Sequence, residues 1–348
     1  MPAAPPARVL VKEVNWLGDV VMSLPAVRAV RRAFPGAHLT LLIKRELASF
    51  FDGAAWPDEI MPYSLAPGLR GLADRWRIIR DIRARRFDLA VLLPRSFDSA
   101  LWPTLAGVRR RAGFATAGRS LMLTDRAPYG RELFSDHQAH DYLYMLQHTL
   151  GIVANADDSV PDVHAPHRAK MRDWLTQCRR DSSGQLIALA VAAAYGPAKE
   201  WPAERFARLI DVLADRHGAE CVLVGAPSER SKCAQVVAAS RRGAIVAAGE
   251  TSVGEALALL SLCDGFAGND SGAMHAAGAL GIGTVGIYGS TRPQRTAPLG
   301  PRTTVLYHPI ECSPCMERTC RFGHYNCLKQ ITPEEVATAL EDLGVFGR

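Results

Sequence analysis

The sequence contains no run of apolar residues long enough to cross a membrane. The longest run, residues 186–195, has about half of the roughly 20 residues that a membrane-spanning helix needs. Residues 1–14 also lack the apolar stretch of a secretory signal peptide. We therefore expect a cytoplasmic protein whose cysteines stay reduced.

Several signatures of nucleotide and metal chemistry are missing as well. There is no D-x-D motif, no G-x-x-x-x-G-K-[ST] loop and no H-E-x-x-H helix. One stretch, residues 281–286, matches the dinucleotide fingerprint G-x-G-x-x-G, but it follows an expected helix and enters an expected strand. The fingerprint requires the reverse order. These features argue against a nicotinamide site, and they leave a metal-bound phosphate without a visible set of ligands.

Lysine is absent between residues 61 and 131, a segment with fourteen arginines and five aspartates. Within residues 74–87 the arginines surround apolar side chains, and helical spacing predicts Trp76, Ile79 and Phe87 on one side of a helix. The pattern is typical of an outer helix packed on a sheet. It also suits contact with an anionic membrane surface or with phosphate groups.

The two halves of the chain begin in the same way. In the first half, a strand pattern at 8–14 leads through a short turn to a helical pattern at 20–34 and a strand pattern at 38–43. In the second half, a strand pattern at 185–192 leads through a loop to a helical pattern at 203–218 and another strand. Each half is therefore predicted to begin with a βαβ unit.

Alternating strands and helices predict parallel sheets, and 348 residues are more than one core usually holds. We expect an α/β fold of two doubly wound, Rossmann-like domains facing across a cleft, at residues 1–165 and 166–348. A C-terminal helix is expected at about 332–344. Ligands bind beyond the carboxyl ends of the strands in such folds, so the loops there hold the candidate residues.

Three stretches carry a resemblance to a known family: the segment 14–44 with its NWLGD turn, the GPAKEWP loop at 196–202, and the NDSGAMH segment at 269–300. Over nearly its whole length the chain resembles the lipopolysaccharide heptosyltransferases of glycosyltransferase family 9. Residues 93–119 are similar to a segment of heptosyltransferase II, which favours that subtype.

The resemblance implies a GT-B fold and inverting transfer of a heptose from ADP-L-glycero-D-manno-heptose to the inner core of lipopolysaccharide, without a catalytic metal or other cofactor. It implies a lipid A-linked core oligosaccharide as acceptor and peripheral contact with the cytoplasmic face of an anionic inner membrane. We expect a monomer that binds no nucleic acid.

Inverting transfer needs a base, positive potential for the departing diphosphate, and hydrogen bonds to the sugar. Asp19, in the turn after the first strand, is the candidate base for the acceptor hydroxyl. The alternative is that Asp19 only caps the following helix. Lys199 is the candidate cation for the diphosphate, and we count it with Asp19 as catalytic; the alternative is a solvated surface lysine.

The remaining donor-binding candidates lie in loops of the second half. Ser271 and Gly272 are expected to begin a helix whose backbone N–H groups bind phosphate. Asp270 is expected to accept hydrogen bonds from heptose hydroxyls or to cap that helix, and His275 either to reach a phosphate oxygen or to pack in the core. The set is completed by residues flanking the other loops, Tyr195, Gly196 and Glu229.

Arginine suits the phosphate groups expected on the acceptor, because its planar fork forms paired, charge-assisted hydrogen bonds. The candidates are Arg95, at a strand end, and the consecutive Arg109, Arg110 and Arg111. The alternative for each is a structural salt bridge.

The Cys-rich loop at 312–327 has no obvious part in sugar transfer. Its four cysteines, Cys312, Cys315, Cys320 and Cys327, are a candidate ligand set for structural zinc. A reduced loop or two disulfides are the alternatives.

Two other functions remain open at this point. The chain could be a relative that uses another nucleotide sugar or another core position. It could also be a non-catalytic protein that binds nucleotide sugars, although such a protein has no use for a carboxylate at Asp19.

Overall fold

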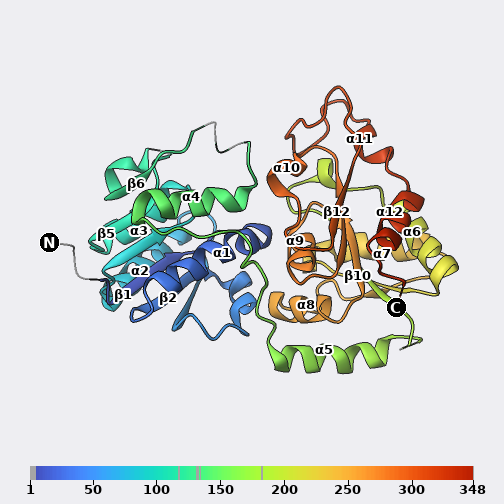
Figure 1. Ribbon diagram of the computed structural model, residues 1–348, viewed down its shortest axis with the longest axis horizontal. Helices are drawn as coiled ribbons and strands as arrows, with labels where there is room; N and C mark the ends of the chain where they lie inside the picture. Colours follow the sequence, from blue (N-terminus) through green and yellow to red (C-terminus); the bar gives the residue numbers. More distant parts are fainter. Residues whose placement is uncertain (1–4, 117, 131–132, 134, 182, 348) are drawn as a thin grey trace. The chain divides into compact units, whose positions relative to one another are not determined.

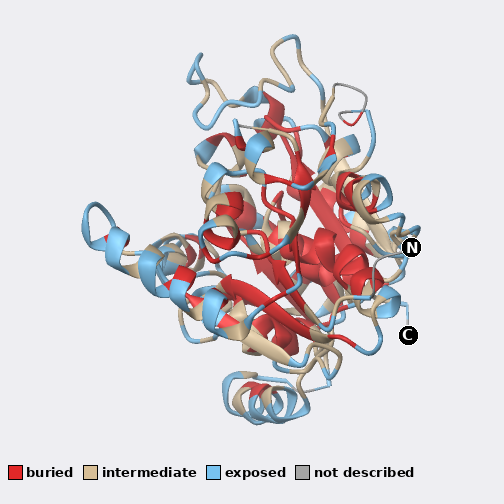
Figure 2. Cartoon of the chain, turned by 90° about the vertical axis from the view of Figure 1, so that its left-hand side faces the viewer, coloured by how far each residue is buried: buried red, intermediate tan, exposed pale blue. Residues whose placement is uncertain are grey.

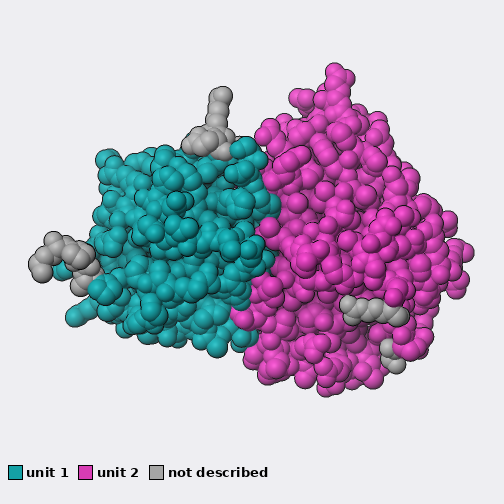
Figure 3. All heavy atoms as spheres, in the orientation of Figure 1, with its two compact units in different colours: residues 1–159 teal, residues 160–348 magenta. Residues whose placement is uncertain are grey.

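The computed structural model describes residues 5–116, 118–130, 133, 135–181 and 183–347. The chain divides into two compact units, Met1–Ser159 and Val160–Arg348, which Figure 3 colours separately. The sequence places the boundary after residue 165, whereas the units divide a few residues earlier. Helix α5 (Ala165–Cys178) therefore belongs wholly to the second unit.

The first unit is built on a six-stranded parallel sheet with the strand order β3-β2-β1-β4-β5-β6. Its strands are β1 (Arg8–Lys12), β2 (His38–Lys44), β3 (Glu59–Tyr63), β4 (Leu89–Leu92), β5 (Arg110–Phe114) and β6 (Asp125–Ala127). Its helices are α1 (Leu17–Ala33), α2 (Arg70–Arg85), α3 (Phe97–Leu105) and α4 (Gln138–Leu150), with the 3-10 turns η1 (Arg45–Phe51) and η2 (Arg119–Met122).

Helix α2 covers this sheet with one buried stripe, formed by Ile78, Ile79 and Ile82. Phe87 joins the same core, as predicted, but Trp76 is 64% exposed, so the prediction that it shares their side was wrong. At 100° per residue, Trp76 is about 60° around the helix from Ile79 but about 120° from Ile82 and 160° from Ile78, so it lies outside the buried stripe. Helices α1 and α4 pack against each other elsewhere in the unit (Figure 1).

The second unit repeats this plan with the strand order β12-β11-β10-β7-β8-β9. Its strands are β7 (Leu186–Ala190), β8 (Glu220–Leu223), β9 (Ile245–Val246), β10 (Gly265–Asn269), β11 (Gly283–Tyr288) and β12 (Thr303–Tyr307). Besides α5, its helices are α6 (Ala203–His217), α7 (Arg230–Ala239), α8 (Val253–Leu260), α9 (Gly272–Ala279), α10 (Pro293–Thr296), α11 (Asn326–Lys329) and α12 (Pro333–Asp342), with η4 (Pro197–Lys199) and η5 (Pro227–Glu229).

The apolar residues of these elements form the buried interior seen in Figure 2. Helix α6 packs with α12 over the second sheet, and it ends where predicted, at Gly218, which adopts the left-handed conformation that glycine tolerates best. Helix α12 begins after Thr332, whose hydroxyl accepts a hydrogen bond from the backbone N–H of Glu335. The expected C-terminal helix is thus present.

Both sheets have the same strand order when each is numbered from its own first strand, namely 3-2-1-4-5-6. The predicted α/β fold of two doubly wound parallel sheets is confirmed. In this arrangement the strand order reverses between the first and fourth strands, and ligands bind at that switch point. None of the helices in the described ranges has the length and apolar character that crossing a membrane requires.

Candidate active site

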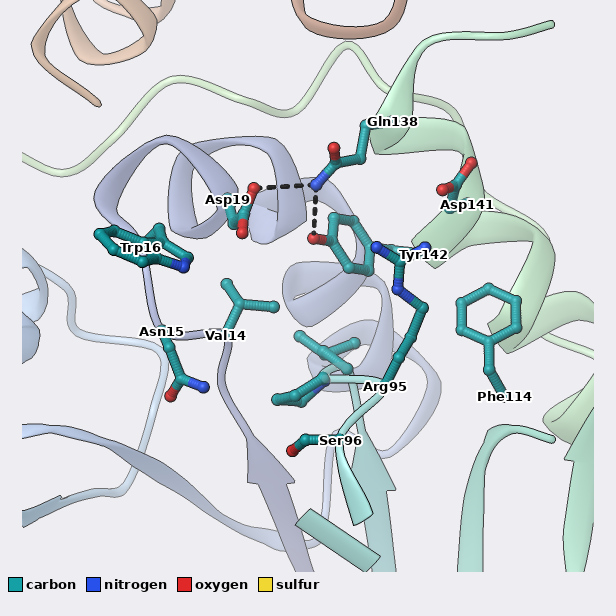
Figure 4. Close-up of a pocket in the computed structure, with 12 residues that line it drawn as sticks. Val14, Asn15, Trp16, Asp19, Arg95, Ser96, Phe114, Gln138, Asp141 and Tyr142 are labelled. Atoms are coloured by element: carbon teal, nitrogen blue, oxygen red, sulfur yellow. Dashed lines mark hydrogen bonds between the residues drawn. The ribbon is translucent and has the colours of Figure 1, made fainter. Parts of the chain in front are cut away.

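A cavity of about 170 Å³ lies at the switch point of the first unit, beyond the carboxyl ends of β1 and β4 (Figure 4). Asp19, which comes after β1, and Arg95, which comes after β4, were both predicted as site residues, and both line this cavity. The remaining lining residues are Val14, Asn15, Trp16, Leu93, Pro94, Ser96, Phe114, Gln138, Asp141 and Tyr142.

Asp19 lies in the first turn of α1, not in the turn before it, because the helix begins at Leu17. The N-cap residue is Trp16, so Asp19 does not have the capping position that was the alternative to catalysis. Its carboxylate is near the helix N-terminus, whose exposed amides favour negative charge. The carboxylate thus lies at the end of the helix where a negative charge is best accommodated.

The Gln138 side chain fixes the orientation of Asp19. Its Nε2 donates to Asp19 Oδ1 at 2.8 Å and to the Tyr142 hydroxyl oxygen at 3.2 Å (Figure 4). Burial raises the pKa of Tyr142 well above its usual value, and the charge of Asp19 adds to the effect. Tyr142 therefore stays neutral beside the carboxylate.

Two buried titratable residues, Lys12 and Glu13, lie at the end of β1, next to Val14 of the cavity wall. Glu13 Oε2 accepts hydrogen bonds from the Val14 backbone N–H (3.0 Å) and from Ser23 Oγ on α1 (3.2 Å). Burial raises the pKa of Glu13 to about 7, and the charge of Asp19 contributes to the rise. Burial likewise lowers the pKa of Lys12 to about 7. Glu13 thus connects β1 to the helix that carries Asp19.

Arg95 follows β4, and its guanidinium lies 4.4 Å from the centre of the Tyr129 ring. Arg109, Arg110 and Arg111 do not join it. Arg110 pairs in register with Leu89, the first residue of β4, which places it at the amino end of the strands and not at the cavity.

The side chains of Arg110 and Arg111 serve local structure instead. Arg110 forms an ion pair with Asp125 at 2.9 Å, and Arg111 Nε donates to the Met122 carbonyl at 2.5 Å. The salt-bridge alternative accounts for Arg110, and the geometry gives no support to an acceptor role for Arg109, Arg110 or Arg111.

In the second unit, the predicted donor residues Lys199 and Asp270 meet at the equivalent switch point. Lys199 follows β7 and Asp270 follows β10. Lys199 Nζ lies 2.5 Å from Asp270 Oδ2, which also accepts a hydrogen bond from Thr291 Oγ1 at 2.7 Å. Both charged side chains are largely buried, so Lys199 is no solvated surface lysine. His275 Nε2 is 3.9 Å from Asp270 Oδ1.

Helix α9 begins at Gly272 with Ser271 as its N-cap, so the helix start predicted there is confirmed. Asp270 is one residue too early to be the cap. The Ser271 hydroxyl is buried and has no hydrogen-bond partner among the described residues. A buried hydroxyl without a partner loses free energy, so this oxygen and the adjacent backbone N–H groups are suited to an incoming polar ligand.

Tyr195 and Gly196 lie in the loop that leads to Lys199, and Lys199 Nζ is 4.9 Å from the centre of the Tyr195 ring. Glu229 is engaged differently. Its Oε2 accepts a hydrogen bond from the Ala226 backbone N–H at 2.8 Å, inside its own loop. No described hydrogen bond or ion pair joins Glu229 to Lys199.

The predicted zinc site finds no support in the structure. Within the described ranges, no group of three or more His, Cys, Asp or Glu side chains is placed to hold a metal ion. Cys312 Sγ lies 3.9 Å from His324 Nε2 in this segment. All four thiols, Cys312, Cys315, Cys320 and Cys327, are free.

Sequence reasoning did not find Gln138, Glu13 or Thr291. Gln138 and Asp19 are 119 residues apart, and no local pattern connects them. Glu13 did leave a signal, because two charged residues at the end of an apolar strand are unusual unless they are buried for a purpose. Thr291 follows β11, so the strand-end rule could have included it.

Comparison with known proteins gives a family match. The profile of glycosyltransferase family 9 (heptosyltransferase) matches residues 75–326. Lipopolysaccharide heptosyltransferase 2 of Escherichia coli (strain K12) is 28% identical over 349 residues, with 97% of this chain and 98% of that protein covered.

Solved structures agree. A structure of E. coli ADP-heptose lps heptosyltransferase II superposes with a TM-score of 0.81 at 26% identity, covering 97% of this chain and 98% of that one. E. coli heptosyltransferase WaaC with ADP-2-deoxy-2-fluoro heptose superposes with a TM-score of 0.70 at 21% identity, covering 96% and 99%.

Proposed function

Since this chain belongs to glycosyltransferase family 9, the heptosyltransferases, we propose that it transfers a heptose from ADP-L-glycero-D-manno-heptose to the inner core of lipopolysaccharide, with inversion at the anomeric carbon. The family resemblance expected from the sequence is confirmed by the match over residues 75–326. The relatives named above are heptosyltransferases, and one was solved with an ADP-heptose analogue, which supports the choice of donor.

One observation carries the proposal beyond family membership. The two units place complementary groups at equivalent switch points: the oriented carboxylate of Asp19 in the first, and Lys199 with the N-terminus of α9 in the second. A base and an anion-binding site are two of the three parts that inverting transfer requires. A protein that only binds nucleotide sugars needs the second part alone.

In the proposed reaction Asp19 accepts the proton of the acceptor hydroxyl as its oxygen bonds to the anomeric carbon of the heptose. The bond from that carbon to the diphosphate breaks, and ADP leaves with the electron pair. Gln138 donates to Asp19 Oδ1 and so holds the carboxylate in one orientation in the cavity.

Lys199, Ser271 and Gly272 receive the diphosphate. The positive end of α9 and the ammonium of Lys199 stabilise the charge that develops on ADP, and no metal is needed for that step. Asp270 accepts hydrogen bonds from heptose hydroxyls, and Tyr195 lines the same region. We assign no role to Glu229.

The acceptor is a lipid A-linked core oligosaccharide, and Arg95 binds one of its phosphate groups. The enzyme then works as a cytoplasmic monomer at an anionic membrane surface. The exposed side of α2, together with its N-cap residue Leu69, is suited to that surface. Leu69, Leu72 and Trp76 are 85%, 52% and 64% exposed, and Arg77 and Arg80 flank them with side chains more than half exposed.

The test is turnover of ADP-heptose against other nucleotide sugars, with lipopolysaccharide that lacks its heptoses as acceptor. We expect turnover with ADP-heptose to dominate, and NMR of the product to show an inverted anomeric centre. Initial rates should be unchanged by EDTA. Faster turnover with a different nucleotide sugar would show that ADP-heptose is not the donor. A rate that falls on chelation and is restored by Mg²⁺ would overturn the metal-free reaction.

A further inference from the structure

The Cys-rich segment, residues 312–327, is hydrogen-bonded to the loop that precedes Lys199. The Tyr195 hydroxyl donates to the Met316 carbonyl at 2.6 Å, and the Ala198 backbone N–H donates to the Arg318 carbonyl at 3.0 Å. The Met316 backbone N–H in turn donates to the Ser290 carbonyl, just after β11, at 2.8 Å. The segment therefore has a fixed place beside the proposed donor site.

Gly196 makes this contact possible. Its φ of +142° is one that side chains disfavour, and a Cβ there would lie 2.6 Å from the Arg318 carbonyl oxygen. Glycine thus allows the backbone of the Cys-rich segment to approach the loop closely. Since that approach involves residue 318 itself, the position of Arg318 relative to the donor loop is set by the backbone.

The Arg318 side chain shares an aromatic ring with Lys199. Its guanidinium carbon is 5.0 Å from the centre of the Tyr195 ring, and Lys199 Nζ is 4.9 Å from the same centre. The two cations are therefore within about 10 Å of each other. Arg318 is exposed, and none of the described carboxylates forms an ion pair with it.

The donor site has too little positive charge for a diphosphate unless Arg318 contributes. Lys199 is already paired with Asp270, so the pair as a whole is close to neutral, and the N-terminus of α9 supplies only about half a charge. Each phosphate of the donor carries a negative charge, and the leaving diphosphate gains more as its bond to the sugar breaks. A guanidinium without a carboxylate partner can bind phosphate oxygens through two parallel hydrogen bonds.

We infer that Arg318 is a further donor-binding residue, which contacts the diphosphate together with Lys199 and is held there by the Cys-rich segment. This rests on the proposed function, because it takes a nucleoside diphosphate sugar as the ligand. It also gives the segment a role in binding that does not depend on any metal.

The experiment is isothermal titration of the full-length protein with ADP, inorganic pyrophosphate and adenosine. Arg318→Ala should raise the Kd for ADP about tenfold or more, because a hydrogen bond to a charged group contributes about 1.5 to 3 kcal/mol. The Kd for adenosine should stay within about twofold, and Arg318→Lys should recover part of the loss. Arg321→Ala is the matched control, since Arg321 is exposed in the same segment with its guanidinium 4.9 Å from the Phe322 ring.

The outcomes separate this inference from the proposed function. If Arg318→Ala binds ADP and pyrophosphate like the wild type, or weakens adenosine binding equally, Arg318 does not bind the diphosphate. If the wild-type protein binds no ADP at all, the proposed donor is wrong. The difference in pyrophosphate binding between Arg318→Ala and Arg321→Ala then decides the role of Arg318. Unchanged thermal unfolding of Arg318→Ala confirms that the segment stays folded.

Discussion

At the switch point of the first unit the carboxylate of Asp19 accepts a hydrogen bond from the neutral amide of Gln138, whereas at the switch point of the second unit the carboxylate of Asp270 is paired with the ammonium of Lys199. Both carboxylates follow strands at the centre of sheets with the same strand order. A carboxylate that is paired with an ammonium is a weaker base and a better positioning group, so the pairing of Asp270 with Lys199 suits Asp270 to positioning.

The two carboxylates also differ in burial. Asp270 is 5% exposed, and its Oδ2 has two hydrogen-bond partners, whereas Asp19 is half-buried and lines an open cavity. The fold therefore supplies the same switch point twice, with Asp19 after the first strand of its sheet and Asp270 after the fourth strand of its own, and the neighbouring side chains decide what chemistry each site performs.

A substitution at Asp19 tests the difference between the two sites most directly. Asp19→Asn removes the base while keeping the hydrogen-bonding shape, and we expect transfer to fall by about 10² to 10⁴ because that is the usual contribution of a general base. Affinity for ADP should be nearly unchanged. Initial rates with saturating substrates and a titration with ADP measure the two effects. A variant with more than about half of the wild-type turnover would show that Asp19 is not the base.

At the second site, the two members of the ion pair should respond in opposite ways. Lys199→Ala should weaken ADP binding about tenfold to a hundredfold, because a buried cation for the diphosphate is lost. Asp270→Asn should bind ADP at least as tightly as the wild type, because removing its charge relieves repulsion and leaves Lys199 for the ligand. Its affinity for ADP-heptose should fall instead. Parallel losses of ADP affinity in both variants would mean that Asp270 acts only by placing Lys199.

Some residues of these two sites could be predicted from the sequence and others could not, for a geometric reason. Lys199, Asp270 and Asp19 could be found because each follows a central strand, and strand ends of a parallel sheet meet at one edge. Arg110 was misplaced because it begins a strand instead of following one. Gln138 and Arg318 depend on contacts between distant segments, which no local periodicity records.

The proposed membrane contact belongs to the first unit alone, which gives a third contrast between the units. Replacing Leu69 and Trp76 together by Ser should weaken binding to vesicles of anionic phospholipid about tenfold or more, since each exposed apolar side chain contributes about 1.5 to 3 kcal/mol when buried. Phe322→Ser, an aromatic residue of the second unit with 60% exposure, is the matched control. Co-sedimentation with anionic and with zwitterionic vesicles measures the effect.

In the wild type, the anionic vesicles should also blue-shift and enhance tryptophan fluorescence, and Trp76→Phe should reduce that change. Higher salt should weaken binding, because it screens the arginines around the apolar patch. Equal binding to both kinds of vesicle would refute the electrostatic part of the proposal. A concentration-dependent dimer that Trp76→Ser dissociates would assign the patch to a second copy of the chain instead.

The smallest effect concerns Glu13, which supports the first site and has no counterpart among the described residues of the second. Its pKa is raised by burial to about 7, so in the folded protein it keeps its proton at pH values where the unfolded chain has lost it. The stability that this proton binding contributes is fully present below the unfolded pKa of about 4.5 and is lost as the pH rises toward 7.

Glu13→Gln removes the titration while keeping a polar side chain for the Ser23 hydroxyl and the Val14 amide. Relative to the wild type, the variant should therefore gain about 1 to 3 kcal/mol of unfolding free energy between about pH 5 and about pH 7. Urea unfolding of both proteins at the two pH values measures the difference. A difference that does not change with pH would show that Glu13 is ionised in the folded protein throughout this range, and that Asp19 has a second negative charge close to it.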